Sequence, residues 1–102
     1  MRERKQMYKV SKKAERDLID IWQYTLEHWS REQANKYLKT ILGAFEQIDK
    51  NPFATGKSCD YIRIGYRKLK VGKHMVFYKI LNTNTVLISR ILHEKMDFER
   101  HI

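Results

Sequence analysis

The feature that most constrains the fold is a pair of helical patterns separated by a two-residue junction. From Lys12 onwards, mainly apolar side chains recur at steps of one, three or four residues, which predicts a stripe along one α-helix ending at His28. The stripe consists of Ala14, Leu18, Ile21, Trp22, Thr25 and Trp29. Ser11 is the expected N-cap, because its hydroxyl can accept a hydrogen bond from a free N–H group of the first turn.

A second helix is predicted directly afterwards. Ser30–Gln33 has the S-x-x-Q pattern of a capping box, and Asn51-Pro52 ends the helix because the residue before proline avoids helical backbone angles. Its apolar stripe consists of Ala34, Tyr37, Leu38, Ile41, Leu42, Phe45 and Ile48. Since only Trp29 and Ser30 separate the two helices, we expect an antiparallel helical hairpin.

The second half of the chain predicts three consecutive strands. Runs rich in β-branched and aromatic residues cover 61–71, 74–81 and 85–92. Gly72-Lys73 suits a tight hairpin turn because glycine can adopt positive φ, and residues 82–84 form the second turn. The three strands are therefore expected to pair as an antiparallel meander.

The remaining segments predict shorter pieces of structure. Residues 6–10 read as a short strand in which Met7 and Tyr8 are available for packing. A loop with Gly56 as its turn residue is expected over 53–60, and a short frayed helix or tail over 94–102.

Within the run 61–71, alternation places Ile62, Ile64 and Tyr66 on one face, and Gly65 allows a bulge.

The predicted element order is β-α-α-β-β-β, which is typical of an α+β fold with a helical hairpin packed on a mostly antiparallel sheet. With 102 residues, a single domain spanning 1–102 is expected.

The charge of the chain favours an anionic partner. The formal net charge is +9, and the stretch from Tyr61 to Lys79 contains six Lys or Arg residues and no acid. Nucleic acid, a membrane surface or an acidic protein segment would each match such a stretch, whereas the alternative is a soluble protein that is merely basic.

Other compositional signals exclude several classes. The single cysteine, Cys59, rules out an intrachain disulfide and is interpreted as an inert loop thiol. One Cys and four His without ligand spacing disfavour a zinc site, and no cofactor or metal is predicted. Without a secretory h-region or a long apolar run, we expect a soluble cytoplasmic protein with no membrane segment.

Three segments resemble the ParE branch of the RelE/ParE toxins. They are "GKSCDYIRIGYRK", "GKHMVFY" and "RILHEKMD", and the similarity extends from about Met7 to Ile102. The resemblance implies a toxin of a bacterial toxin–antitoxin pair that traps DNA gyrase on cleaved DNA and thereby blocks replication. It further implies a ParD-like antitoxin with a ribbon-helix-helix domain and an acidic tail. DNA would then be reached only indirectly, through the antitoxin or gyrase.

RelE-type relatives instead cleave messenger RNA on the ribosome, and this is the alternative function. The resemblance implies that such relatives place an arginine on the middle strand and an aromatic or basic residue near the C-terminus to carry out this cleavage. Here His74 stands where that arginine would be, and His93 is followed by Glu94 where some relatives carry tyrosine. These departures favour a chain that is not an enzyme. If it is a nuclease, His74, His93 and Arg67 are the catalytic candidates.

His93 allows two interpretations. An unperturbed histidine titrates near pH 6.5 and could act as a general acid or base. A lone histidine without a nucleophile or an orienting carboxylate is more often structural, and we expect His93 to bind a backbone carbonyl or Asp97. Arg90, predicted on the same face as Ile88 and Leu92, would pair with Asp97 or Glu94, stack on a tyrosine, or belong to a partner-binding face.

A set of aromatic, basic and flexible side chains forms the predicted partner-binding surface. Its members are Trp29, Tyr37, Arg63, Tyr66, Arg67, Lys68, Arg90, His93 and Met96. Arg67 and Lys68 are expected to face solvent, whereas Trp22 is expected in the core. The antitoxin tail should place a helix beside the hairpin and a strand at the edge formed by 61–71 or by 6–10. A third hypothesis is a toxin without potency that survives as a co-repressor.

Overall fold

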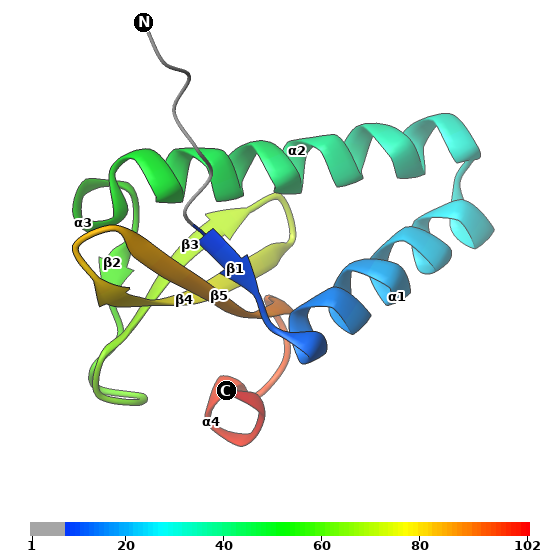
Figure 1. Ribbon diagram of the computed structural model, residues 1–102. Coiled ribbons are helices and arrows are strands. Elements are labelled where there is room, and N and C mark those ends of the chain that lie inside the picture. The colour runs from blue at the N-terminus through cyan, green and yellow to red at the C-terminus, as the bar shows by residue number, and fades with distance from the viewer. Residues whose placement is uncertain (1–7) are drawn as a thin grey trace, which may run out of the picture.

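The computed structural model describes residues 8–102 and shows an α+β fold in which a helical pair covers one face of a five-stranded sheet (Figure 1). The elements are β1 (Tyr8–Val10), α1 (Lys12–His28), α2 (Arg31–Lys50), α3 (Pro52–Thr55), β2 (Lys57–Ser58), β3 (Tyr66–Val71), β4 (His74–Asn82), β5 (Thr85–His93) and α4 (Phe98–His101). The strand order is β1-β5-β4-β3-β2, in which β1 runs parallel to β5 and every other pair is antiparallel.

The predicted fold class is thus confirmed, including the helical hairpin and the mostly antiparallel sheet. Of the strand predicted over 6–10, its first two residues lie outside the described part of the chain. No helix within residues 8–102 combines the length and the apolar character needed to cross a membrane.

Both predicted helix starts are confirmed by their caps. Ser11 Oγ accepts the N–H of Ala14 at 3.0 Å and donates to the carbonyl of Ser89 at 2.7 Å, so the cap also joins α1 to β5. Ser30 Oγ accepts the N–H of Gln33 at 3.0 Å. Short polar side chains at these two positions therefore fix where the two helices begin.

The main core lies between the hairpin and the sheet. Its buried residues come from α1, α2 and the three longest strands, β3, β4 and β5, and they are Ala14, Ile41, Ala44, Phe45, Ile48, Val71, Val76, Tyr78, Val86, Ile88 and Ile91. Each predicted stripe is wrong at one margin. On α2, Leu42 is exposed and Ala44 is buried instead. On α1, Trp29 is 75% exposed because the helix has already ended there.

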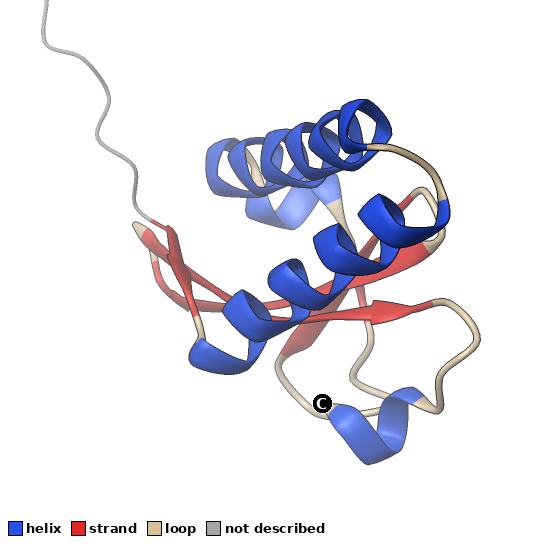
Figure 2. Ribbon diagram, turned by 90° about the vertical axis from the view of Figure 1, so that its right-hand side faces the viewer, coloured by secondary structure: helices blue, strands red, loops and turns tan. Residues whose placement is uncertain are grey.

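A smaller core lies on the opposite face of the sheet. Cys59, Phe77 and Leu92 are buried there, covered by side chains that include Phe98 and Ile102 of the C-terminal segment. Figure 2 shows α4 on the side of the sheet opposite to the helical pair. The predicted C-terminal tail is therefore a short helix that completes a second apolar layer.

The strand predicted over 61–71 is wrong in its first half. Only Tyr66–Val71 is a strand, and the preceding residues form turns in which Tyr61 is 71% and Ile64 85% exposed. Gly65 adopts φ of +86°, so it ends the turn and is not a bulge within a strand. Alternation alone could not distinguish a strand from a loop that happens to alternate.

The loop predicted over 53–60 contains regular structure, namely α3 and β2. Gly56 is extended there and does not take a positive φ. Its importance is steric, because a Cβ atom at Gly56 would lie 2.6 Å from the carbonyl oxygen of Lys68 and against the Tyr78 hydroxyl. Glycine lets the chain between α3 and β2 pass close to Lys68 of β3 and Tyr78 of β4.

A β-bulge at Ser89 changes the face that later residues of β5 present. Tyr78 pairs with Ile88, whereas the preceding Phe77 pairs with Arg90, so Ser89 is the extra residue. Ile88 and Ile91 consequently both face the main core. Arg90 lies on the other face, and the prediction that it shares a face with Ile88 is wrong.

Arg90 has a partner that the sequence did not indicate. Its Nε and Nη2 donate to the two carboxylate oxygens of Asp17 at 2.8 and 2.9 Å, and the same carboxylate accepts the N–H of Ile91 at 2.9 Å. The predicted partners of Arg90, Asp97 and Glu94, are not used. The ion pair joins α1 to β5 with both side chains largely covered.

We expect Asp17→Asn to lower the free energy of unfolding by about 3 kcal/mol, because it leaves a partly buried guanidinium without its counter-charge. Urea unfolding at neutral pH measures the change. Glu94→Gln is the matched control, since it removes a carboxylate whose ion pair with Lys70 is exposed, and its effect should be too small to resolve. Equal destabilisation by the two variants would contradict the importance of the Asp17–Arg90 pair.

Candidate functional site

Three of the predicted site residues, Tyr37, His74 and His93, form one cluster at the ends of β4 and β5. His74 and His93 are paired across the two strands, with ring centroids 5.3 Å apart at an edge-on angle. The Tyr37 hydroxyl comes from α2 and lies 2.6 Å from His74 Nδ1. It also lies 3.2 Å from the carbonyl oxygen of Val71 and accepts the N–H of Lys73 at 3.1 Å.

The cluster is electrically neutral at its centre. Burial, followed by repulsion from His93, lowers the pKa of His74 from 6.5 to about 4. Burial also raises the pKa of Tyr37, so the phenol keeps its proton at neutral pH. A neutral His74 can accept that proton in a hydrogen bond at Nδ1. The lowered pKa makes His74 a weak base near neutral pH, where general bases work best with a pKa close to the working pH.

His93 is held by the chain that follows it. Its Nδ1 accepts the N–H of Lys95 at 3.2 Å. The predicted carbonyl or Asp97 partner is wrong, although the contact does fix the turn after β5. In neutral His93 this acceptor Nδ1 leaves the ring proton on Nε2.

Arg67 does not join the two histidines. It lies four positions along β3 from Val71, the residue paired with His74, which corresponds to about 13 Å of strand. Its guanidinium instead donates to the carbonyl oxygens of Pro52, Phe53 and Gly56 and to the Tyr78 hydroxyl. The three residues named as nuclease candidates are thus not brought together.

Those four hydrogen bonds overturn the prediction that Arg67 faces solvent. The planar guanidinium with its five donors fits the group of carbonyls at α3, which a lysine could not do. Arg67 holds α3 against the sheet.

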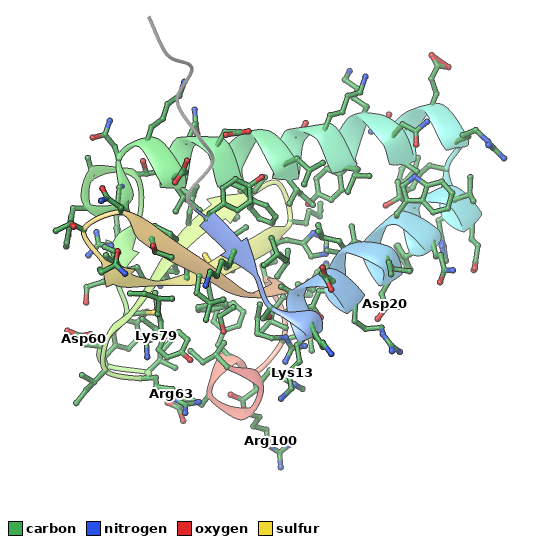
Figure 3. All side chains as sticks on the ribbon, viewed as in Figure 1. Lys13, Asp20, Asp60, Arg63, Lys79 and Arg100 are labelled. Atoms are coloured by element: carbon green, nitrogen blue, oxygen red, sulfur yellow. The ribbon has the colours of Figure 1, made fainter. Side chains whose placement is uncertain are left out.

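Lys68, the next residue, points to the opposite face of β3 and remains accessible. Its Nζ lies 2.6 Å from the Tyr61 hydroxyl. Two positions earlier, Tyr66 has Lys79 Nζ at 5.2 Å and the Arg63 guanidinium at 5.4 Å from its ring centroid. Figure 3 shows the labelled Arg63 and Lys79 below the sheet, on the side away from α2. We call Tyr61, Arg63, Tyr66, Lys68 and Lys79 the outer basic face.

The C-terminal segment is fastened to the same side of the sheet. Arg90 Nη1 donates to the carbonyl oxygen of His101 at 2.7 Å, and Arg63 Nη1 donates to that of Ile102 at 2.6 Å. Phe98 packs edge-on against Phe77 with ring centroids 4.9 Å apart. Met96, another predicted contact residue, is exposed in the turn before α4.

Trp29 lies in the junction between α1 and α2, and this end of the hairpin projects beyond the sheet (Figure 1). Nearby, the Tyr24 and His28 rings stack with centroids 3.9 Å apart on the solvent side of α1. Trp22 is only partly buried and donates its indole N–H to Asn35 Oδ1 at 2.9 Å. The prediction of a core Trp22 is therefore wrong, since it packs between the two helices and keeps a polar partner.

Sequence reasoning missed Asp17 and Tyr78. Asp17 occupies a position three after Ala14 and four before Ile21, so an acid on the buried stripe was the signal for a charged partner. Tyr78 is fully buried and donates its hydroxyl proton to the carbonyl oxygen of Pro52 at 2.6 Å.

Metal and thiol chemistry receive no support from the arrangement. Among residues 8–102, no group of three or more His, Cys, Asp or Glu side chains could hold a metal ion. Cys59 is buried, and burial raises the pKa of its thiol, which is the environment of an unreactive cysteine.

His74 predicts how stability depends on pH. Because its pKa of about 4 lies below the unfolded value of 6.5, the unfolded chain binds the extra proton between these two values. The stabilisation is complete above pH 6.5 and is lost progressively as the pH falls towards 4. We expect His74→Gln to flatten this part of the stability curve, measured by urea unfolding at several pH values.

Lys39→Gln is the control, since it changes an exposed charge of α2 outside the histidine cluster. It should keep the slope of the parent chain. A slope that His74→Gln leaves unchanged would contradict a depressed pKa at His74.

Comparison with known proteins gives a consistent answer. Residues 8–98 match the family model described as the ParE toxin of the type II toxin–antitoxin system parDE. A Toxin ParE1 of Mycobacterium tuberculosis is 38% identical over 95 residues, covering 93% of this chain and 96% of the relative. A Toxin ParE1 of Caulobacter vibrioides is 36% identical with the same coverage.

Solved structures share the fold. A chain from the chromosomal ParDE system of P. aeruginosa superposes with a TM-score of 0.75 at 19% identity, covering 85% of this chain and 94% of that one. A chain of the toxin–antitoxin complex RelBE2 from Mycobacterium tuberculosis gives 0.64 at 20% identity, covering 85% and 95%. With the family model matched over residues 8–98 and relatives at 36–38% identity along nearly their full lengths, the chain belongs to the ParE toxins of type II toxin–antitoxin systems.

Proposed function

We propose that this toxin acts in the cytoplasm by trapping DNA gyrase on cleaved DNA, that it has no catalytic centre of its own, and that a ParD-like antitoxin neutralises it. The observation that carries the proposal is the separation of the nuclease candidates. Arg67 donates its hydrogen bonds to the carbonyls around α3. His74 has a lowered pKa and forms a hydrogen bond with Tyr37. Cleavage of RNA by its own 2′-hydroxyl needs a base, an acid and a cation on one phosphate.

The edges of the sheet support the antitoxin part of the proposal. Among the described residues, β1 and β2 are the outer strands, and β2 covers only Arg67 and Lys68 of β3. The β1 edge lies beside the helical pair, where the Tyr8 ring packs edge-on against Phe45 at 5.8 Å. A tail that leaves the hairpin can therefore continue as a strand along β1.

The net charge of +9 supports an acidic, disordered tail as the antitoxin segment. Opposite charges accelerate the capture of such a tail and make the capture sensitive to salt. The large wrapped surface then offsets the conformational entropy that the tail loses on folding.

Gyrase trapping is tested with purified chain, gyrase and relaxed plasmid. We expect linear DNA only when gyrase and this chain are both present, and none after addition of the antitoxin. A chain carrying His74→Gln and His93→Gln should remain equally active once its folding is verified, because no proton transfer by either ring is involved. Ribosome-dependent cleavage of messenger RNA that disappears in this double variant would contradict the proposal.

Antitoxin binding is tested by hydrogen exchange at single amides. Ser11 donates its N–H to Ile88, so alternation directs the Val10 N–H away from β5 and towards the open edge. We expect the antitoxin to slow exchange at Val10 strongly, while the Lys70 amide changes little. Lys70 is two alternations from Tyr66, whose carbonyl accepts the Cys59 N–H on the side away from β4, so its N–H points to the opposite edge beyond the residues that β2 covers. Slowed exchange at Lys70 with none at Val10 would indicate that the strand is added at that edge.

A further inference from the structure

Among residues 8–102, the three cations of the outer basic face, Arg63, Lys68 and Lys79, form no ion pair with an Asp or Glu side chain. No Asp or Glu occurs between residues 61 and 93. Within the described chain, two cations of this stretch pair with acids, namely Lys70 with Glu94 and Arg90 with Asp17. For Arg63, Lys68 and Lys79, in contrast, the contacts given above are with tyrosines and a backbone carbonyl. The neighbouring Asp60 accepts the N–H of Gly65 at 2.8 Å and stays within its own turn.

These three cations surround two phenol rings in a continuous strip. Tyr66 and Lys79 are directly paired across β3 and β4, and Lys68 lies two positions further along the same face, a step of about 7 Å. Lys68 Nζ lies 5.2 Å from the centroid of the Tyr61 ring. The step of about 7 Å along the strand is close to the separation of neighbouring phosphates on an extended nucleic-acid strand.

Tyr61 gives the strip its chemical selectivity. Its ring is 71% exposed in the turn before β3, beside Ile64, which is 85% exposed. A protruding aromatic ring next to cations is the arrangement on which unpaired bases stack while their phosphates meet Lys or Arg. An acidic peptide would use the cations but would gain little from the ring.

We propose that the outer basic face binds single-stranded nucleic acid directly, with bases stacked on Tyr61 and phosphates held by Arg63, Lys68 and Lys79. The contacts involve phosphate and base and no sugar hydroxyl, so DNA and RNA strands should bind equally. The inference goes beyond the proposed function, since it concerns the chain without gyrase or antitoxin. It also replaces the expectation that DNA is reached only through a partner protein.

Fluorescence anisotropy with labelled twelve-residue oligothymidine and oligouridine tests the proposal on the full chain, without gyrase. The combined variant Arg63→Gln, Lys68→Gln and Lys79→Gln should weaken binding and lower the salt slope by about 2, which is the loss of three phosphate contacts on a single strand. The matched control is Arg31→Gln, Lys36→Gln and Lys39→Gln, which removes the same charge from exposed positions of α2. It should keep nearly the affinity and slope of the parent chain.

Substitution of Tyr61 keeps the test independent of folding, because this exposed side chain supports neither core. Tyr61→Leu should weaken binding about tenfold or more through lost stacking, and Tyr61→Phe should retain it. Equal weakening by the α2 control, or no effect of Tyr61→Leu, would overturn the proposal. So would polyglutamate or duplex DNA competing as well as the single strand, or binding confined to one sugar type.

Discussion

The ion pair between Asp17 and Arg90 is the contact on which the arrangement of the layers depends. The Asp17 carboxylate of α1 accepts hydrogen bonds from Nε and Nη2 of Arg90 and from the N–H of Ile91, so it fixes the helix to β5 in position and in angle. The third nitrogen, Nη1, donates to the carbonyl of His101 and thereby holds α4. A single side chain thus links α1, β5 and the C-terminal segment, and it adds direction to an arrangement that apolar burial alone would not orient.

The bulge at Ser89 is what makes this linkage possible. Without the extra residue, Arg90 would share the face of Ile88 and would place a charge inside the main core. With it, β5 supplies Ile88 and Ile91 to one apolar layer and Leu92 to the other. The sheet can therefore bury residues on both faces, under the helical pair on one side and under α4 on the other (Figure 2).

The adjacent residues Arg67 and Lys68 illustrate how the fold assigns different tasks to similar side chains. Period-two alternation directs Arg67 towards α3, where four oxygen atoms accept its hydrogen bonds. Lys68 points to the opposite face, beside Tyr61. The histidine cluster shows a related separation, because Tyr37 and burial keep His74 neutral. Similar basic side chains therefore differ in whether the fold leaves their charge accessible to a partner.

The sequence by itself determined the features that arise between residues close together in the chain. These are the caps at Ser11 and Ser30, the hairpin and the turn at Gly72, where φ is +58°. It also carried the family resemblance. Only the tertiary structure decided the pairing of Asp17 with Arg90, which lie 73 positions apart. It also decided the hydrogen bonds from Arg67 to the carbonyls around α3 and the turn conformation of residues 61–65. Local hydrogen bonds depend on spacing along the chain, whereas these contacts depend on which surfaces remain after the sheet and hairpin have packed.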